Sequence, residues 1–421
     1  MTSTPCTVSF FTLLSSKSKP SKSHLSFICR SQRIFSTNNL DFALHDSLDA
    51  SGIDTKHARS SRDGFCSQIQ WLSEVERETS IAINRGVDLG KAALHIAAED
   101  DALVSHSSVP LPVDAFVERL DDLSMGFCSL YIPPVGSSPE LFLTNLERYF
   151  YVHKGFRRTT SLNHSNIHSL YLHSVLTRRS GTAVMLSLIY SEMLKMLRLC
   201  GFLDFDVEIL FPHDLVGLPR GYHKQKSKLS DEQHIMTTQS LLVEMLRNLK
   251  DAFWPFKNDH SRSLFLRAAH AANCVGPSTV EGPFKPSNSV SGFEFASAKA
   301  AQHRLGRGVW TSVRFGDMRR ALAACERLIL LGSDLRELRD YSVLLYHCGF
   351  YEESLEYLKL YQDSMQQQGG NEKELSSGPP GDIEEDAVEK LVIRLNLILM
   401  EEGWTRPSPS RNLWGNSSEP W

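Results

Sequence analysis

A glycine turn followed by a long apolar segment is the feature of this sequence that most restricts its fold. Residues 182–199 read TAVMLSLIYSEMLKMLRL, and twelve of these eighteen residues are apolar. Most of the polar residues recur at spacings of three or four and form one narrow stripe on a helix: Ser187, Ser191, Lys195 and Arg198. A helix with so little polar surface is covered on most sides by other elements. We therefore expect residues 182–199 to form the central helix of a domain.

Helical periodicity extends over most of the chain around this segment. Apolar residues three and four apart predict helices at residues 71–80, 87–103, 113–127, 139–156, 237–254 and 261–274. One segment alternates instead, since DFDVEILF (204–211) places apolar and acidic residues on opposite faces. It predicts a strand whose outward face carries Asp206 and Glu208. The fold class that follows is α+β, predominantly α-helical.

The C-terminal part contains an internal repeat. Gly316 and Ala321 recur as Gly349 and Ser354, in both cases 33 residues later, which is close to the tetratricopeptide period. With about one and a half copies, the repeat must bury its apolar face against neighbouring helices. Two-helix repeats of this kind dock peptides or partner helices. Three repeat residues are the candidates for such protein contacts: Tyr341, Leu345 and Tyr346.

The first forty residues have the composition of an organelle transit peptide. They hold ten serines, five basic residues and no acidic residue. The apolar stretch VSFFTLL precedes every lysine and arginine, which is the reverse of a secretory signal. The uncharged opening, rich in serine and threonine, favours the chloroplast stroma as the destination, with the mitochondrion as the alternative.

Charge and cysteine spacing argue against several classes of partner. The chain carries −4 and its first forty residues carry +5, so the remainder carries −9. Such an acidic body, without a basic cluster, does not predict nucleic-acid binding. The eight cysteines lie far apart in the sequence and form no CxxC pair, and no uncharged apolar run is long enough to span a membrane. We expect no cofactor and no metal site.

Several motifs taken together resemble the SirB-type transglutaminase-like family, in which a papain-like core precedes tetratricopeptide repeats. The segment LFLTNLERYFYVHKGFR is similar to the family's helix and Gly-Phe turn, and VLTRRSGTAVMLSLIY to its glycine turn and core helix. The later segments ILFPHDLV, LLVEMLRNLKDAF and LRELRDYSVLLYHCGFYEESLEYL resemble its strand, its Met-Leu helix and its repeat. The resemblance implies a transglutaminase-like core joined to tetratricopeptide-like helical hairpins, as in an organelle-targeted plant member of the family.

The predicted organisation has six parts. They are a transit peptide (1–40), a disordered linker (41–70), a transglutaminase-like domain (71–255), a short helix with an irregular linker (256–310), a tetratricopeptide-like helical domain (311–402) and a tail (403–421). Within the helical domain, the low-complexity acidic segment 366–386 is expected to be a disordered insert.

The catalytic triad that the resemblance would imply is not filled in this sequence. A thiol enzyme of this type needs a cysteine at the start of the core helix, a histidine base and a group that orients the histidine. The glycine turn reads Ser180, Gly181, Thr182, without a thiol. At the family's histidine position the chain has Asp214, and His213 comes one residue early, which reverses its facing on a strand. The third motif is not recognisable between residues 222 and 235.

Two readings of the function remain open. The first is a non-catalytic scaffold or adaptor that binds another protein or peptide through the helical repeats. The alternative is a thiol-dependent hydrolase or acyltransferase with a relocated nucleophile. Cys200, at the far end of the core helix, is expected to be a packing residue, and a hydroxyl nucleophile at Ser180 or Thr182 would need a base that the sequence does not identify. His164 and His168 have the spacing of a helical metal pair, but no HExxH-like carboxylate accompanies them.

Overall fold

The computed structural model describes residues 42–50, 52–78, 81, 85–105, 109–131, 138–159, 167–212, 216–223, 236–256, 262–274, 318–369 and 379–405. The predicted transit peptide, most of the linker before the repeats and most of the tail lie outside these residues. The described chain is predominantly helical, with a few short strands, as the α+β prediction required.

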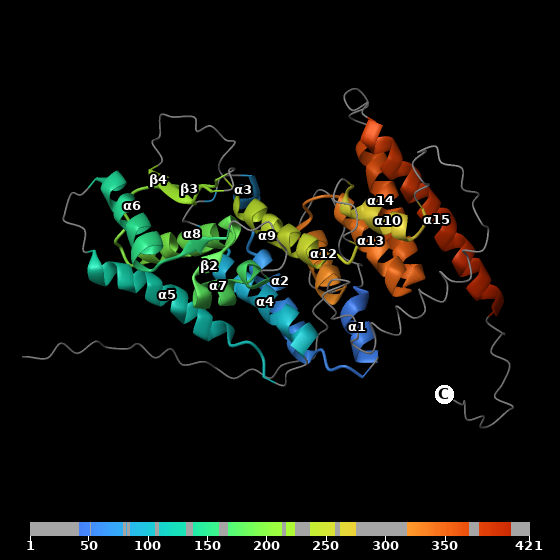
Figure 1. Ribbon diagram of the computed structural model, residues 1–421, viewed down its shortest axis with the longest axis horizontal. Coiled ribbons are helices and arrows are strands. Elements are labelled where there is room, and N and C mark those ends of the chain that lie inside the picture. The colour runs from blue at the N-terminus through green and yellow to red at the C-terminus, as the bar shows by residue number, and fades with distance from the viewer. Residues whose placement is uncertain are drawn as a thin grey trace, which may run out of the picture.

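The apolar segment forms the central helix of the first part of the molecule, as predicted. This helix, α8, contacts α4, α5 and α9, and most of its residues are buried (Figure 1). The helices of this part are α2 (Lys56–Ile69), α3 (Glu74–Glu78), α4 (Leu89–Ser105), α5 (Val113–Leu130), α6 (Pro139–Glu147), α7 (Leu172–Arg178), α8 (Ala183–Leu199) and α9 (Thr238–Phe253), with the short helices η2 (Arg148–His153) and η3 (Ile167–Leu170).

Two small sheets lie beside α8. The strands β1 (Arg157–Arg158) and β2 (Ser180–Gly181) are parallel, and β3 (Val207–Leu210) pairs with β4 (Arg220–His223) in an antiparallel hairpin. The strand prediction for 204–211 is confirmed over β3, but the outward facing of Glu208 is wrong. Glu208 is buried because its direct cross-strand neighbour, Tyr222, lies over it and donates a hydrogen bond to its carboxylate.

The segment expected to be a disordered linker, 41–70, is helical instead. It forms α1 (Ala43–Ala50) and α2, which packs along α4. Both helices bury apolar side chains, among them Leu44, Leu48 and Phe65, which are at most 1% exposed. The prediction of disorder failed because few apolar residues pack these helices into the core. The helices against which they pack, α4 for α2 and α12 for α1, come later in the chain.

The C-terminal helices form a second part beside the first. They are α10 (Leu264–Ala271), α12 (Met318–Leu331), α13 (Arg336–Cys348), α14 (Tyr351–Gly369) and α15 (Pro379–Thr405). The hairpin α13–α14 turns at Gly349, whose φ of 83° is left-handed, and the hydroxyls of Ser342 and Ser354 bond across the two helices. The expected insert 366–386 is helical at both ends, since α14 runs to Gly369 and α15 begins at Pro379.

The two parts share one hydrophobic core. Helix α12 packs on α9 and α4 of the first part and on α13 of the second, so apolar burial continues from one part into the other (Figure 1). Among the described residues, no helix is both long and apolar enough to cross a membrane.

Candidate functional site

The start of α8 is the position at which a papain-like enzyme would place its nucleophile. Helix α7 ends at Arg178, the following Arg179 has a left-handed φ of 55°, and β2 then carries the chain to Thr182. The sheet fixes this turn, because the amide of Arg157 donates to the carbonyl of Arg179 at 2.9 Å and the amide of Thr159 to that of Gly181 at 2.9 Å. The turn is therefore held by the backbone of β1.

Gly181 is required by close packing at this turn. A Cβ built at Gly181 would lie 2.8 Å from Val175 Cγ1 and 2.9 Å from Val175 Cγ2, which is closer than a real Cβ approaches. Any larger residue would push α7 away from the start of α8. The glycine that the sequence marks as a turn thus also lets two helices approach.

The residues at the start of α8 cap the helix, and none of them is a cysteine. The Thr182 hydroxyl accepts a hydrogen bond from the amide of Met185 at 3.4 Å, which makes Thr182 the N-cap of α8. The first helical residue, Ala183, is buried. The hydroxyl of Thr182 is engaged with the helix backbone, and Ser180 lies half-buried in β2.

The described cysteines lie elsewhere. Cys200 is at the opposite end of α8, about 27 Å from Thr182 along a straight helix. It is exposed, so the expectation that it packs in the core is wrong; the helix ends one residue earlier and the chain turns away there. Burial raises the pKa of Cys128, Cys325 and Cys348, which disfavours the nucleophilic thiolate at these positions.

The other predicted chemical positions are placed only in part. His213, Asp214 and His164 lie outside the described residues. His168 lies in η3, and His173 in α7 stacks edge-on against Phe116. Within the part of the chain that the structure describes, no group of three histidine, cysteine or acidic side chains could hold a metal ion.

The three residues predicted to contact a partner are buried. Tyr341 is 0%, Leu345 1% and Tyr346 5% exposed. The ring of Tyr341 packs edge-on against Tyr357 at 4.8 Å between ring centroids, and its hydroxyl donates to Glu326. Phe42 packs edge-on against Tyr341, α12 packs on α13, and Arg394 of α15 lies over the ring of Tyr346, so these side chains do not form an open contact surface.

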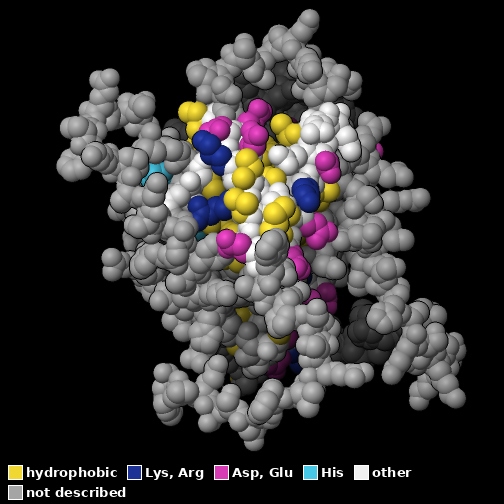
Figure 2. Space-filling model, turned by 90° about the vertical axis from the view of Figure 1, so that its right-hand side faces the viewer, with side chains coloured by type: hydrophobic (Ala, Val, Ile, Leu, Met, Phe, Trp, Pro, Cys, Tyr) yellow, Lys and Arg dark blue, Asp and Glu magenta, His cyan; other side chains and the backbone are white. Residues whose placement is uncertain are grey.

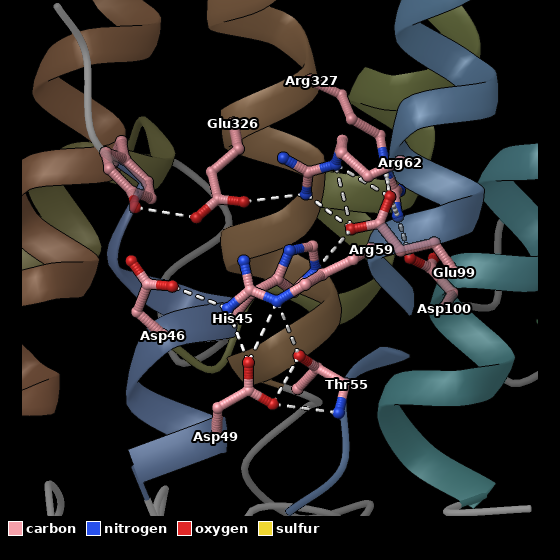
Figure 3. A network of polar contacts seen from close by, with 11 residues as sticks. His45, Asp46, Asp49, Thr55, Arg59, Arg62, Glu99, Asp100, Glu326 and Arg327 are labelled. Atoms are coloured by element: carbon pink, nitrogen blue, oxygen red, sulfur yellow. Dashed lines mark hydrogen bonds and ion pairs between the residues drawn. The ribbon is translucent and has the colours of Figure 1, made fainter. Parts of the chain in front are cut away.

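A buried network of charges joins the N-terminal helices α1, α2 and α4 to α12 (Figure 3). Glu99 of α4 lies at its centre and is bonded by Arg62 of α2 at 2.6 Å, by Arg327 of α12 at 2.9 Å and by His45 of α1 at 3.1 Å. Arg62 also reaches Glu326 of α12 at 2.7 Å. No sequence pattern indicates this network, because its members are spread over more than 280 residues.

Opposite charges keep the buried carboxylate of Glu99 ionised. Glu99 and Arg327 are 0% exposed, and Arg327 also bonds Asp100 at 2.6 Å. Burial alone would raise the pKa of Glu99, but Arg327 and Arg62 outweigh it and hold that pKa well below its usual range. Asp100 accepts a further hydrogen bond from the Tyr171 hydroxyl at 2.6 Å. Enclosed in this way, the charges fix the positions of four helices and are not open to a substrate.

A second buried group of charges connects α9 to the last helices. Lys250 of α9 lies 2.5 Å from Glu337 and 2.9 Å from Asp340, both on α13. Arg339 of α13 reaches Glu384 of α15 at 2.6 Å. Burial would lower the pKa of Lys250, but the two carboxylates raise it above its usual range. Together the two groups of charges connect helices from both parts of the molecule.

The glycine turn before α8 lies inside the segment that matches a known protein family. Residues 114–203 match the family model of the transglutaminase-like superfamily, so a transglutaminase-like domain is present. The match begins within α5 and ends just after α8, and therefore includes the glycine turn. No curated protein and no solved structure matches the chain.

Proposed function

We propose that this protein is a non-catalytic interaction scaffold, built from the transglutaminase-like domain and a tetratricopeptide-like helical hairpin in the manner of the SirB-type family. The observation that carries the proposal is the start of α8, where the Thr182 hydroxyl caps the helix and neither the glycine turn nor the first turn of the helix contains a cysteine. Loss of the nucleophile removes covalent acyl transfer, whereas the helical framework around it is retained.

The continuity of the core supports a scaffold as well. The charges around Glu99 and Lys250 hold helices from both parts in one arrangement, so the outer surfaces of the two parts keep fixed relative positions. Such preorganisation lowers the entropic cost of binding a partner that contacts both. The composition of residues 1–40 favours the chloroplast stroma as the site of action, with the mitochondrion as the alternative.

Affinity capture tests the proposal. The full chain is immobilised and exposed to extracts of isolated chloroplasts and of isolated mitochondria, and bound proteins are identified by mass spectrometry. We expect a specific partner from the chloroplast extract, recovered equally by the wild type and by Thr182→Ala, because binding does not use the hydroxyl. Loss of the cap costs about 1 kcal/mol of stability, so circular dichroism must show that the variant is folded.

Thr182→Ser keeps the cap and serves as the matched control. Recovery of no specific protein from either extract would refute the scaffold. Hydrolysis of an ester or amide substrate that disappears in Cys200→Ala or Thr182→Ala would instead favour the relocated-nucleophile hydrolase.

A further inference from the structure

We propose that the outer face of α15 binds a basic amphipathic helix of a partner protein. The inference deepens the proposed scaffold function, because it names the surface and the chemistry of the partner. It replaces the surface predicted at Tyr341, Leu345 and Tyr346, whose side chains lie in the core.

Helix α15 carries apolar residues on two separate faces. One face is buried against α14 and α10: Ala387, Val388, Leu391, Leu395 and Ile398. The other is exposed: Ile383, Ile393, Leu397 and Met400 are 52%, 53%, 58% and 63% exposed. At about 100° per residue, the four exposed residues fall within an arc of about 100° that does not overlap the buried arc. The stripe is continuous only over Ile393, Leu397 and Met400, at i, i+4 and i+7, because Asp386 and Lys390 occupy the same arc between Ile383 and Ile393.

An exposed stripe of this kind is unusual on a surface helix. The solvent-facing side of an amphipathic helix is ordinarily polar, and apolar side chains exposed on a protein surface ordinarily occur singly. Several large apolar residues aligned on one helix mark an interaction surface. Figure 2 looks onto the side of the molecule on which α15 lies, and hydrophobic side chains gather there among acidic and basic ones.

The charges on and beside the stripe are mostly negative. Among the described residues of α15, the exposed carboxylates are Glu385, Asp386, Glu389 and Glu401, and the exposed cation is Lys390. Lys390 is already paired with Asp386 at 2.6 Å. The stripe thus offers apolar burial within a negative field, which favours a positively charged partner.

The same charges disfavour a second copy of this chain as the occupant. In an antiparallel pair of α15 helices, the acidic residues at 385–389 of one copy would lie near Glu401 of the other, and in a parallel pair each carboxylate would lie near its own counterpart. Like charges placed opposite one another oppose association. A helix with apolar residues at i, i+4 and i+7, flanked by lysine and arginine, matches both the stripe and its charge.

Two synthetic peptides test the proposal against the full chain. Both are about five helical turns long, with leucine at i, i+4, i+7 and i+11; one carries lysine at the flanking positions and the other glutamate. Binding is measured by fluorescence anisotropy at low and at physiological salt. We expect the lysine peptide to bind at least about tenfold more tightly than the glutamate peptide, with a smaller ratio at higher salt.

Variants locate the binding on α15. Leu397→Glu should weaken binding of the lysine peptide about tenfold or more. The double variant Glu385→Lys, Glu389→Lys should reduce the ratio between the affinities of the lysine and glutamate peptides. Val152→Glu, at a valine of η2 that is 74% exposed, introduces the same charge elsewhere and should leave binding unchanged. All altered residues are exposed, and thermal unfolding followed by circular dichroism confirms that each variant is folded.

Equal binding to the wild type and to Leu397→Glu, or equal binding of the two peptides, would overturn the proposal. So would a dimer of the wild type by light scattering that Leu397→Glu converts to a monomer, because a second copy would then occupy the stripe. A result that refutes the α15 surface can be distinguished from a result that refutes the scaffold function. If affinity capture recovers the same partner with Leu397→Glu as with the wild type, the scaffold stands and only the α15 surface is refuted.

Discussion

His347 shows how one half-buried side chain couples the fold to pH. Its Nε2 lies 2.9 Å from the carbonyl of Ala268, and its ring lies 4.3 Å from that of Phe256, between centroids. Burial lowers the pKa of His347 from 6.5 to about 4. The unfolded chain therefore takes up a proton near pH 6.5, and the folded protein only near pH 4. Acidification between these values favours the unfolded chain.

We predict that this histidine contributes about 2 kcal/mol to the loss of stability between pH 7 and pH 5. Urea unfolding at both pH values measures the loss for the wild type and for His347→Gln, in which that contribution should be missing. His270→Gln, at an exposed histidine of α10, is the control and should lose as much stability as the wild type. An unchanged loss in His347→Gln would contradict the assignment.

The predictions made from the sequence failed most often for the exposure of individual side chains. Periodicity placed Glu208 outward because a strand alternates, but it carries no information on the tyrosine of β4 that covers it. The repeat pattern identified Tyr341 and Leu345 as members of a helical hairpin and left open which side of the hairpin the rest of the chain would cover. Exposure is a property of tertiary contacts, and one sequence does not specify them.

At the scale of elements, α1 is a small helix that closes the core from outside. Leu44 and Leu48 are buried, Phe42 stacks on Tyr357, and His45 bonds Glu99. Burying each leucine contributes about 1.5–3 kcal/mol. We predict that a chain beginning at Gly52 is less stable by about 3 kcal/mol or more than one beginning at Asp41, measured by urea unfolding. Equal stability of the two chains would show that α1 does not hold the fold together.

Elements with a strong local pattern were predicted, and those that depend on distant partners were not. Residues 182–199 had one polar stripe and became α8, and the alternation in 204–211 became β3. The segments of α1 and α2 mix charged and apolar residues, so their composition suggested disorder. The glycine turn of the candidate site was also predicted, whereas the charges around Glu99 were not, because they meet only after α2, α4 and α12 have packed.

The fold of the whole molecule depends on the contacts that α2, α4 and α12 make around Glu99. Three helices from separate regions of the chain share the carboxylate of Glu99, and α12 also packs on α9 and α13. A buried ion pair is not necessarily more stable than an apolar contact of the same shape, but removal of one partner leaves the others buried and unpaired. A change at Glu99 should therefore affect both parts of the molecule together.

We predict that Glu99→Gln lowers the free energy of unfolding by about 3–5 kcal/mol, because the guanidinium groups of Arg62 and Arg327 lose their shared anion. Glu356→Gln, at an exposed glutamate of α14, should change it by less than about 0.5 kcal/mol. Circular dichroism reports helices of both parts, and tryptophan fluorescence includes the buried Trp254 that ends α9. The two signals should shift together in Glu99→Gln, since α12 belongs to both cores. Two separate transitions would show instead that the parts fold independently and that the network only holds them side by side.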